Sequence, residues 1–280
     1  MVINLEGFKR NERIGGIMHI LTSRPNEVLT YNYFSKLFNV KKPSISGDVS
    51  IMKRTVEKLG IGLIETIPGA NGGVRFIPGN NKDETKIFLE ELCDELSKKE
   101  RLIPGGYIYM MDVINNPHIV RRVGMILANE FSGVKIDHIV TIETKGIPIG
   151  LMVAESLGVP LVVIRKNMRI TEGTAVNINY ISGSTKIIQT MSLSKRALKP
   201  GEKVLIVDDF MRAGGTIKGI REMMGEFNAE VVGVGVFIAT LEPEDKLIKN
   251  YISLLKLEMV NEEEEKISMK SNYQLLRQFK

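Results

Sequence analysis

Residues 204–219, VLIVDDFMRAGGTIKG, constrain the fold of this chain more than any other segment. An apolar run that ends on two adjacent carboxylates, Asp208 and Asp209, predicts a buried strand, and a helix is predicted to follow. The small residues between them leave backbone N–H groups free to surround a phosphate, which the helix dipole also favours. This phosphate loop comprises Arg212, Ala213, Gly214, Gly215 and Thr216. Carboxylates beside a phosphate must face hydroxyls or a cation, so the segment suits a phosphorylated ribose with Mg²⁺ nearby.

The alternation of apolar runs and helical patterns extends over residues 137–240 and predicts an α/β fold, a parallel sheet with helices on both faces. In such sheets ligands bind at the carboxyl ends of the strands. Residues 167–196 are polar and rich in β-forming residues. They are predicted to form a flexible loop that closes over the site and excludes water.

Two further strand ends carry candidate ligand-binding residues. Thr144, Lys145 and Gly146 lie between a predicted strand and a predicted helix, where a lysine and consecutive amides suit a diphosphate. Arg165 and Lys166 form a basic turn after the next strand. A plain strand-to-helix turn at the first segment, and a solvated basic turn at the second, remain alternative interpretations.

Apolar positions in the first 60 residues recur at helical spacing and predict three short helices. The first covers residues 10–22, and Thr30 is placed to cap the second. The third is predicted to end at Gly60. Its apolar stripe consists of Ile45, Val49, Met52, Val56 and Leu59.

The residues after Gly60 alternate around a turn with the composition of a β-hairpin tip. The residues of this turn are Pro68, Gly69, Asn71, Gly72 and Gly73. Three helices followed by such a hairpin resemble a winged helix-turn-helix, in which the third helix enters the major groove of DNA.

The excess positive charge of the chain lies in this N-terminal part. The chain has 38 basic and 33 acidic residues, and its first 80 residues hold 11 basic and 6 acidic side chains. The other 200 residues hold 27 of each, so only the N-terminal part suits a polyanion. Candidate DNA-binding residues are Lys41, Lys42, Ser44, Ser46, Lys53, Arg54 and Arg75. The alternative is a solvated charged face on a helical bundle.

Composition limits the remaining chemistry. Cys93 is the single cysteine, so no internal disulfide and no cysteine-only metal cluster can form, which fits a reducing cytosol. It lies on the apolar side of a predicted connecting helix, residues 83–97, and is expected to be a core thiol. The N-terminus has no apolar signal region and no apolar run is long enough for a membrane span. We therefore expect a soluble, cytoplasmic protein that does not contact a membrane.

The acidic pair and the phosphate loop closely resemble the signature with which type I phosphoribosyltransferases bind 5-phosphoribosyl-1-pyrophosphate (PRPP). A winged helix joined to such a body is similar to the purine operon repressors of Gram-positive bacteria. The resemblance also covers the segments RLIPGGYIYMMD, ETKGIP, NINYISGS and QTMSLSKR. It implies a winged-helix DNA-binding domain at residues 1–78 and a phosphoribosyltransferase-like effector-binding domain at residues 79–280.

By this resemblance the second domain binds PRPP as an effector and catalyses no transfer. No cofactor is obligatory and no side chain is a direct metal ligand, since PRPP carries its Mg²⁺ to a position near Asp208 and Asp209. The resemblance also places Arg165 and Lys166 near the pyrophosphate, Tyr107 near the ligand pocket and Phe210 where a base would lie. The protein would be a homodimer, and PRPP would weaken its binding to double-stranded DNA at purine operon control sites.

Three alternatives stay open at this stage. The chain could be an active purine phosphoribosyltransferase with an appended regulatory DNA-binding head, because the acidic pair and the phosphate loop are both intact. A PRPP-binding module that acts only through protein partners would leave the basic third helix and hairpin unexplained. A nucleotide that bears a pyrophosphate, such as an alarmone, could compete with PRPP for the same loops.

Overall fold

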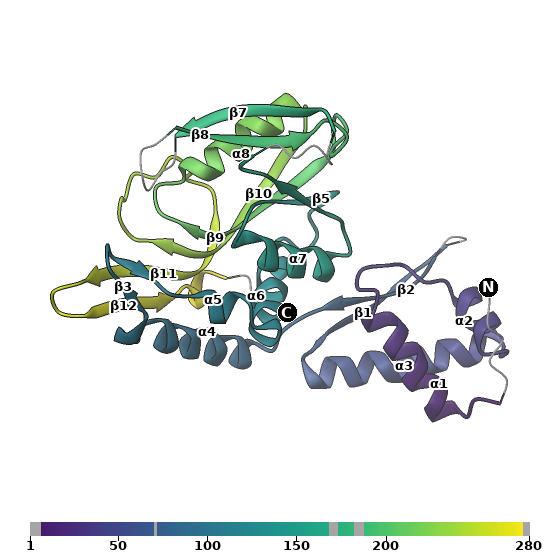
Figure 1. Cartoon of the computed structure of the whole chain (residues 1–280). Coiled ribbons are helices and arrows are strands. Elements are labelled where there is room, and N and C mark those ends of the chain that lie inside the picture. Colours follow the sequence, from purple (N-terminus) through teal and green to yellow (C-terminus); the bar gives the residue numbers. More distant parts are fainter. Residues whose placement is uncertain (1–6, 70–71, 168–172, 182–187, 277–280) are drawn as a thin grey trace. The chain divides into compact units, whose positions relative to one another are not determined.

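The computed structural model describes residues 7–69, 72–167, 173–181 and 188–276, and these divide into two units (Figure 1). The main division falls between Asn81 and Lys82. Three helices and one hairpin form the first unit. Their bounds are α1 Arg10–Thr22, α2 Tyr31–Leu37, α3 Lys42–Leu59, β1 Gly62–Ile67 and β2 Gly73–Pro78.

The helices of the first unit begin and end where local chemistry favours it. Thr30 accepts a hydrogen bond from the Tyr33 N–H through Oγ1, over 3.1 Å, and so caps α2 as predicted. Gly60 ends α3 in the left-handed conformation, with φ of 64°, also as predicted. The predicted stripe of α3 is buried except at its last position, because Leu59 is 57% exposed. Leu59 is the last residue of the helix.

A buried carboxylate joins α1 to α3. Asp48 is fully buried, with Oδ2 2.6 Å from Arg13 Nε and Oδ1 3.1 Å from Arg10 Nε. The Arg13 side chain is 10% exposed, whereas that of Arg10 is 61% exposed. Because a buried charge without a partner is costly, Arg13 is the partner that this carboxylate requires.

The second unit is built on a six-stranded sheet with strand order β12-β11-β10-β9-β5-β6. All neighbouring strands are parallel except β12, which runs antiparallel to β11 at one edge. The strands of this sheet are β5 His138–Ile142, β6 Leu161–Ile164, β9 Lys203–Met211, β10 Glu230–Thr240, β11 Ile252–Asn261 and β12 Lys266–Ser271. The exposed acidic run 262–265 forms the turn between β11 and β12.

Helices cover both faces of this sheet, as predicted. Buried α8 side chains, among them Ile220 and Met224, pack with Val204 and Ile206 on one face of the sheet. On the other face, α6 packs against β10 and β11, and α4 packs against β11 and β12. The helices of this unit are α4 Lys82–Leu96, α5 Met111–Ile114, α6 Pro117–Glu130, α7 Gly146–Leu157 and α8 Gly215–Glu226.

Two small antiparallel pairs complete the second unit. The first is the hairpin β3 Leu102–Ile103 with β4 Tyr107–Ile108, and the second is the ribbon β7 Ala175–Ile181 with β8 Ile188–Ser194. Short 3-10 turns lie at Lys99–Arg101 and Tyr273–Leu275. No helix in the part of the chain described here is long and apolar enough to span a bilayer.

Cys93 is a core thiol, as predicted. It is buried on α4 together with the neighbouring apolar residues of the predicted stripe, Phe88, Leu89, Leu92 and Leu96. Burial raises the pKa of its thiol to about 12, and the carboxylates of Asp94, Glu90 and Glu258 act in the same direction. The thiol therefore stays protonated near neutral pH and is a poor nucleophile.

The β3–β4 hairpin is held in place by one arginine. Arg101 Nη1 and Nη2 lie 2.8 and 2.7 Å from the Asp112 carboxylate, and Nη2 lies 2.6 Å from Glu95 Oε1. Nη1 also donates to the Tyr109 carbonyl over 3.0 Å. These hydrogen bonds lower the pKa of the Asp112 carboxyl. The end of α4, the hairpin and α5 therefore share a single planar, always charged donor group.

Substitution of Arg13 by Met is expected to destabilise the first unit by about 3 kcal/mol, because it leaves the buried Asp48 charge without its main partner. Arg10→Met is the matched control, with an expected loss of about 1 kcal/mol or less, since Arg10 is mostly exposed. Urea unfolding of the full chain, with hydrogen exchange of α1 and α3 followed in parallel, measures both. Equal losses in the two variants would contradict this account.

Candidate functional site

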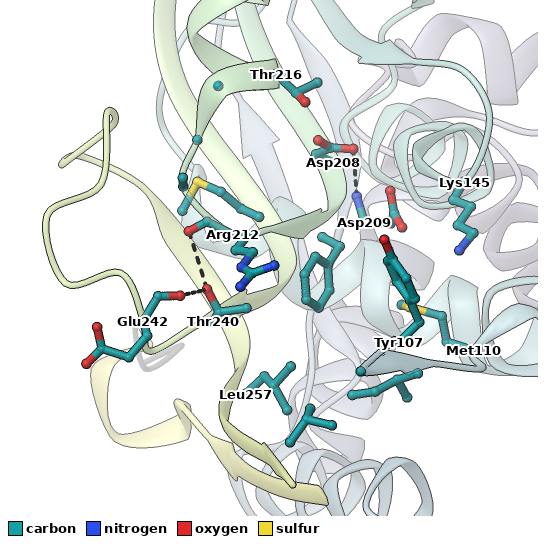
Figure 2. Close-up of a pocket in the computed structure, with 18 of the residues that line it drawn as sticks. Tyr107, Met110, Lys145, Asp208, Asp209, Arg212, Thr216, Thr240, Glu242 and Leu257 are labelled. Atoms are coloured by element: carbon teal, nitrogen blue, oxygen red, sulfur yellow. Dashed lines mark hydrogen bonds between the residues drawn. The ribbon is translucent and has the colours of Figure 1, made fainter. Parts of the chain in front are cut away.

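A cavity of about 590 Å³ opens in the second unit, where the carboxyl ends of β9 and β10 meet the β3–β4 hairpin and β11 (Figure 2). Figure 2 shows Lys145 and Tyr107 on one side of it and Arg212 on the other. The predicted site residues that line it are Tyr107, Lys145, Asp208, Asp209, Phe210, Arg212, Ala213, Gly214, Gly215 and Thr216. One cavity thus collects side chains from segments about 100 residues apart in the sequence.

The two carboxylates lie near the end of β9 in the middle of the sheet. Strand β9 does not end on them, because its pairing with β10 continues to Met211, opposite Ala239. Asp208 is 4% exposed, and its Oδ1 accepts a hydrogen bond from the Asp209 N–H over 3.0 Å. The acidic pair is therefore held by a central strand, which fixes its position more firmly than a loop would.

Burial raises the pKa of both carboxyls. For Asp208 the neighbouring charge of Asp209 adds to the effect of burial, while Lys166 opposes it. For Asp209 burial is again the largest cause, and its hydrogen bond with Asp208 and the charges of Lys145 and Lys166 oppose it. Two adjacent carboxylates in this environment lack compensating charge. A ligand that brings hydroxyl donors or a cation would supply it.

The phosphate loop, residues 212–216, connects β9 to α8. Gly214 has φ of 84°, a left-handed conformation that favours glycine, and α8 begins at Gly215. The first N–H groups of a helix have no acceptor within the helix, so those of α8 face the cavity mouth with the positive end of the dipole. This arrangement fits one phosphate group.

The 144–146 segment lies against the acidic pair, although only Lys145 lines the cavity. A Cβ atom at Gly146 would lie 2.3 Å from Thr141 Oγ1 and 3.2 Å from Asp208 Oδ1, so a larger residue would displace one of them. The peptide bond between Glu143 and Thr144 is cis. Gly146 also begins α7, which makes this segment a second helix N-terminus beside the same carboxylates.

Arg165 and Lys166 do not line the cavity. Arg165 Nη1 lies 3.2 Å from Glu143 Oε2, and the Lys166 N–H donates to Glu143 Oε1 over 2.6 Å. Glu143 thereby links the basic turn after β6 to the segment that precedes α7. Lys166 still acts on the site through its charge, which favours the ionised form of both aspartates.

The loop predicted at residues 167–196 includes the antiparallel ribbon β7–β8. Residues 168–172 and 182–187 of this segment lie outside the described residues, as does Asn71 of the predicted hairpin tip. The prediction of a flexible loop that closes over the site stays a prediction.

Several cavity residues were not singled out from the sequence. Thr240 and Glu242 could have been found, because they lie at the carboxyl end of β10, at the same edge of the sheet as the carboxyl end of β9 that carries Asp209. The other missed lining residues are Gly105, Gly106, Ile108, Met110, Met211, Ile217, Leu257, Glu258, Met259 and Val260. Nothing in the local sequence marks the β11 residues as cavity-lining, because their pattern is that of an ordinary strand.

In the first unit, the predicted DNA-binding residues of α3 and its N-cap lie outside the buried stripe and are exposed. They are Lys41, Lys42, Ser44, Ser46, Lys53 and Arg54. Arg75 differs, because its Nε lies 2.6 Å from Glu65 Oε2 across the β1–β2 hairpin. Arg75 therefore shares its charge with a carboxylate, whereas the two basic residues Lys53 and Arg54 form no ion pair with another described residue.

Comparison with known proteins assigns a family to each unit. Residues 9–78 match the model described as bacterial purine repressor, N-terminal, and residues 111–272 match the phosphoribosyl transferase domain. The chain is 42% identical over 273 residues to the purine biosynthesis transcriptional repressor PurR of Bacillus subtilis, covering 98% of this chain and 95% of that protein. It is 43% identical over 253 residues to the purine biosynthesis transcriptional activator PurR of Lactococcus lactis, covering 90% and 93%.

The fold of the second unit also has solved relatives. Adenine phosphoribosyltransferase from Thermoanaerobacter pseudethanolicus aligns with a TM-score of 0.52 at 24% identity, covering 60% of this chain and 99% of that one. At this identity the likeness concerns the fold alone. The matches to both family models and the identity over nearly the whole length show that this chain belongs to the bacterial purine repressor family, with a phosphoribosyltransferase-type second domain.

Proposed function

We propose that this chain regulates purine genes by binding double-stranded DNA through its first unit and PRPP through the cavity of its second unit. The observation that carries the proposal is the convergence of the acidic pair, the phosphate loop and Lys145 on one cavity. These are the groups that a ribose with phosphates at both ends would need. PRPP occupancy would weaken DNA binding.

Each part of PRPP has a matching group. Asp208 and Asp209 would accept hydrogen bonds from the ribose hydroxyls, and the phosphate loop would bind the 5-phosphate. Lys145 and the amides of the 144–146 segment would bind the pyrophosphate, with the charges of Arg165 and Lys166 nearby. Tyr107 and Phe210 would border the side of the ribose where a purine base attaches in an enzyme.

The site also fits the Mg²⁺ that accompanies PRPP. Carboxylate oxygens are hard ligands of the kind that Mg²⁺ prefers, and the raised pKa of both aspartates means that burial disfavours their ionised forms in the free site, which a nearby cation would favour. Mg²⁺ would offset repulsion between the acidic pair and the phosphates. The cation would arrive with the ligand and interact near the pair, without a dedicated protein cage.

Regulation then follows from linkage. A ligand that binds better to the DNA-free form shifts the population away from DNA, and a tenfold loss of operator affinity requires about 1.4 kcal/mol of coupling. We propose repression, the action named for the Bacillus relative, although the Lactococcus relatives are named activators. We further propose a homodimer, located in the bacterial cytoplasm together with the DNA.

The first test compares binding to a purine operon control fragment with and without Mg-PRPP. We expect PRPP to reduce DNA affinity at least tenfold in the wild-type chain, and to have no effect on an Asp208→Asn, Asp209→Asn variant that still binds DNA. The same preparation is assayed for nucleotide formation from adenine, guanine, hypoxanthine and xanthine. Enzyme-like turnover would favour the transferase alternative, and stronger DNA binding with PRPP would reverse the proposed direction of control.

A second prediction concerns pH. Because the pKa of both aspartates is raised in the free site, and the ionised pair accepts the ribose hydroxyls and Mg²⁺, ligand binding should release protons. PRPP affinity should therefore rise with pH over the range in which the free pair titrates. Calorimetric titration in two buffers with different ionisation enthalpies measures the protons released. Pyrophosphate is the control ligand, because its binding can release protons from its own phosphate groups but does not use the acidic pair. If both ligands release equal numbers of protons, the acidic pair does not accept the ribose hydroxyls and Mg²⁺ as proposed.

A third prediction concerns the DNA-binding face. Lys53→Ala and Arg54→Ala should each weaken operator and non-specific DNA binding alike and reduce the salt slope of log K by about 1. Lys86→Ala, which removes an exposed lysine from α4, is the control and should leave the slope unchanged. Fluorescence anisotropy at several salt concentrations provides the slopes. An unchanged slope in both α3 variants would place the DNA elsewhere.

A further inference from the structure

The loop of residues 241–248, which follows β10, packs directly on the phosphate loop. The Leu247 N–H donates to the Ala213 carbonyl over 2.9 Å. A Cβ atom at Gly214 would lie 3.3 Å from the Ile248 backbone nitrogen. Two successive phosphate-loop residues thus rest on the 241–248 loop. Thr240 Oγ1, on the last residue of β10, donates to the Glu242 carbonyl over 2.5 Å and lies 3.3 Å from the Arg212 carbonyl oxygen, as Figure 2 shows.

Lys246 closes the 241–248 loop on itself. Its Nζ donates to the Pro243 carbonyl over 2.6 Å and to the Leu241 carbonyl over 3.3 Å. The residue is only 8% exposed, an unusual position for an ammonium group. Its side chain forms no ion pair with a carboxylate of the described residues, and Glu242 and Lys256 are the charged groups whose fields reach it. Burial lowers its pKa.

Burying an ammonium group costs free energy unless hydrogen bonds compensate the lost hydration. The two carbonyls that accept from Lys246 supply these hydrogen bonds, and they do so only in the closed conformation of the 241–248 loop. The conformation in question places the Leu247 N–H under Ala213 and the Ile248 backbone against Gly214. Both contacts act on the backbone whose N–H groups would surround a phosphate. Backbone N–H donors bind an anion well only when they are held within a fraction of an ångström of the required positions. The contacts that hold the phosphate loop therefore influence its affinity for a phosphate group.

We propose that Lys246 is a positioning residue for the phosphate loop: it closes the 241–248 loop so that the Leu247 N–H and the Ile248 backbone hold Ala213 and Gly214 in their anion-binding shape. It contacts no ligand itself, since it is absent from the residues that line the cavity. This inference rests on the proposed ribose phosphate site. The inference predicts that affinity for the 5-phosphate depends on Lys246 and that affinity for the pyrophosphate does not. The reason is that the 144–146 segment, which would bind the pyrophosphate, lies on the other side of the acidic pair from the phosphate loop.

The test compares Lys246→Met with Lys249→Met. Both remove one lysine charge from the same stretch of chain, but the Lys249 side chain is 79% exposed and its nearest carboxylate oxygen, on Asp245, is 3.7 Å away. Calorimetric titration of the full chain with ribose 5-phosphate and, separately, with pyrophosphate gives the two affinities. We expect Lys246→Met to weaken ribose 5-phosphate binding at least tenfold and pyrophosphate binding less than twofold, and Lys249→Met to change neither.

Hydrogen exchange of the ligand-free chain provides a readout independent of any ligand. Lys246→Met should speed exchange in the peptide that covers the phosphate loop and leave the peptide that covers α7 unchanged. Equal weakening of both ligands, or ribose 5-phosphate affinity within twofold of the wild-type value, would overturn the inference. If wild-type protein binds no ribose 5-phosphate, the proposed site fails, and the exchange result still decides whether Lys246 supports the loop.

Should Lys246→Met fail to fold, Lys246→Gln carries the same test, because it removes the ammonium group and shortens the reach to the Pro243 and Leu241 carbonyls while keeping a polar side chain. It should weaken ribose 5-phosphate binding more than pyrophosphate binding and speed exchange in the phosphate-loop peptide. Equal effects on both ligands, with no change in exchange, would again overturn the inference.

Discussion

The second unit depends on an electrostatic conflict at the end of its central strand. Asp208 is buried and Asp209 is half-buried beside it, so the charge of Asp209 raises the cost of ionising Asp208, and pairing of β9 with β10 holds the pair in place. Several nearby groups supply positive potential. Two helix N-termini, at Gly146 and Gly215, and the charges of Lys145 and Lys166 face the pair. The site is consequently balanced only when a ligand contributes donors or a cation.

Backbone support, rather than side-chain charge, gives the anion-binding loops their shape. The phosphate loop has few side-chain atoms of its own and is contacted by the Leu247 N–H and the Ile248 backbone. The 144–146 segment is similarly fixed by Glu143, which binds both Arg165 and the Lys166 amide. Arg165 is therefore a partner of Glu143, and its position near the pyrophosphate stays a prediction. Loops made of small residues need such outside support because they have little to pack with.

Helix α3 of the first unit carries residues that stabilise the fold and candidate DNA-binding residues on different faces. On α3, Asp48 faces α1 and is neutralised there, while Lys53 and Arg54 lie outside the buried stripe. Part of the positive charge of the first 80 residues is neutralised within the unit, because Arg10, Arg13 and Arg75 form ion pairs with carboxylates. Fewer positive charges are available to DNA than composition suggests, and those that remain are concentrated on α3 and its N-cap.

Local periodicity and local hydrogen bonding in the sequence were enough to predict the three helices and the hairpin of the first unit, the connecting helix and the parallel strands within residues 137–240. They also predicted the caps at Thr30 and Gly60, the core thiol at Cys93 and the phosphate loop. The sequence could not determine which distant segments share the cavity. Strand order brings Thr240, Glu242 and the end of β11 to the cavity, and the β3–β4 hairpin, which lies outside the six-stranded sheet, reaches it through tertiary packing. The pairing of Arg165 with Glu143 and of Arg75 with Glu65 was equally invisible, since side-chain partners across a fold depend on distances that no local pattern encodes.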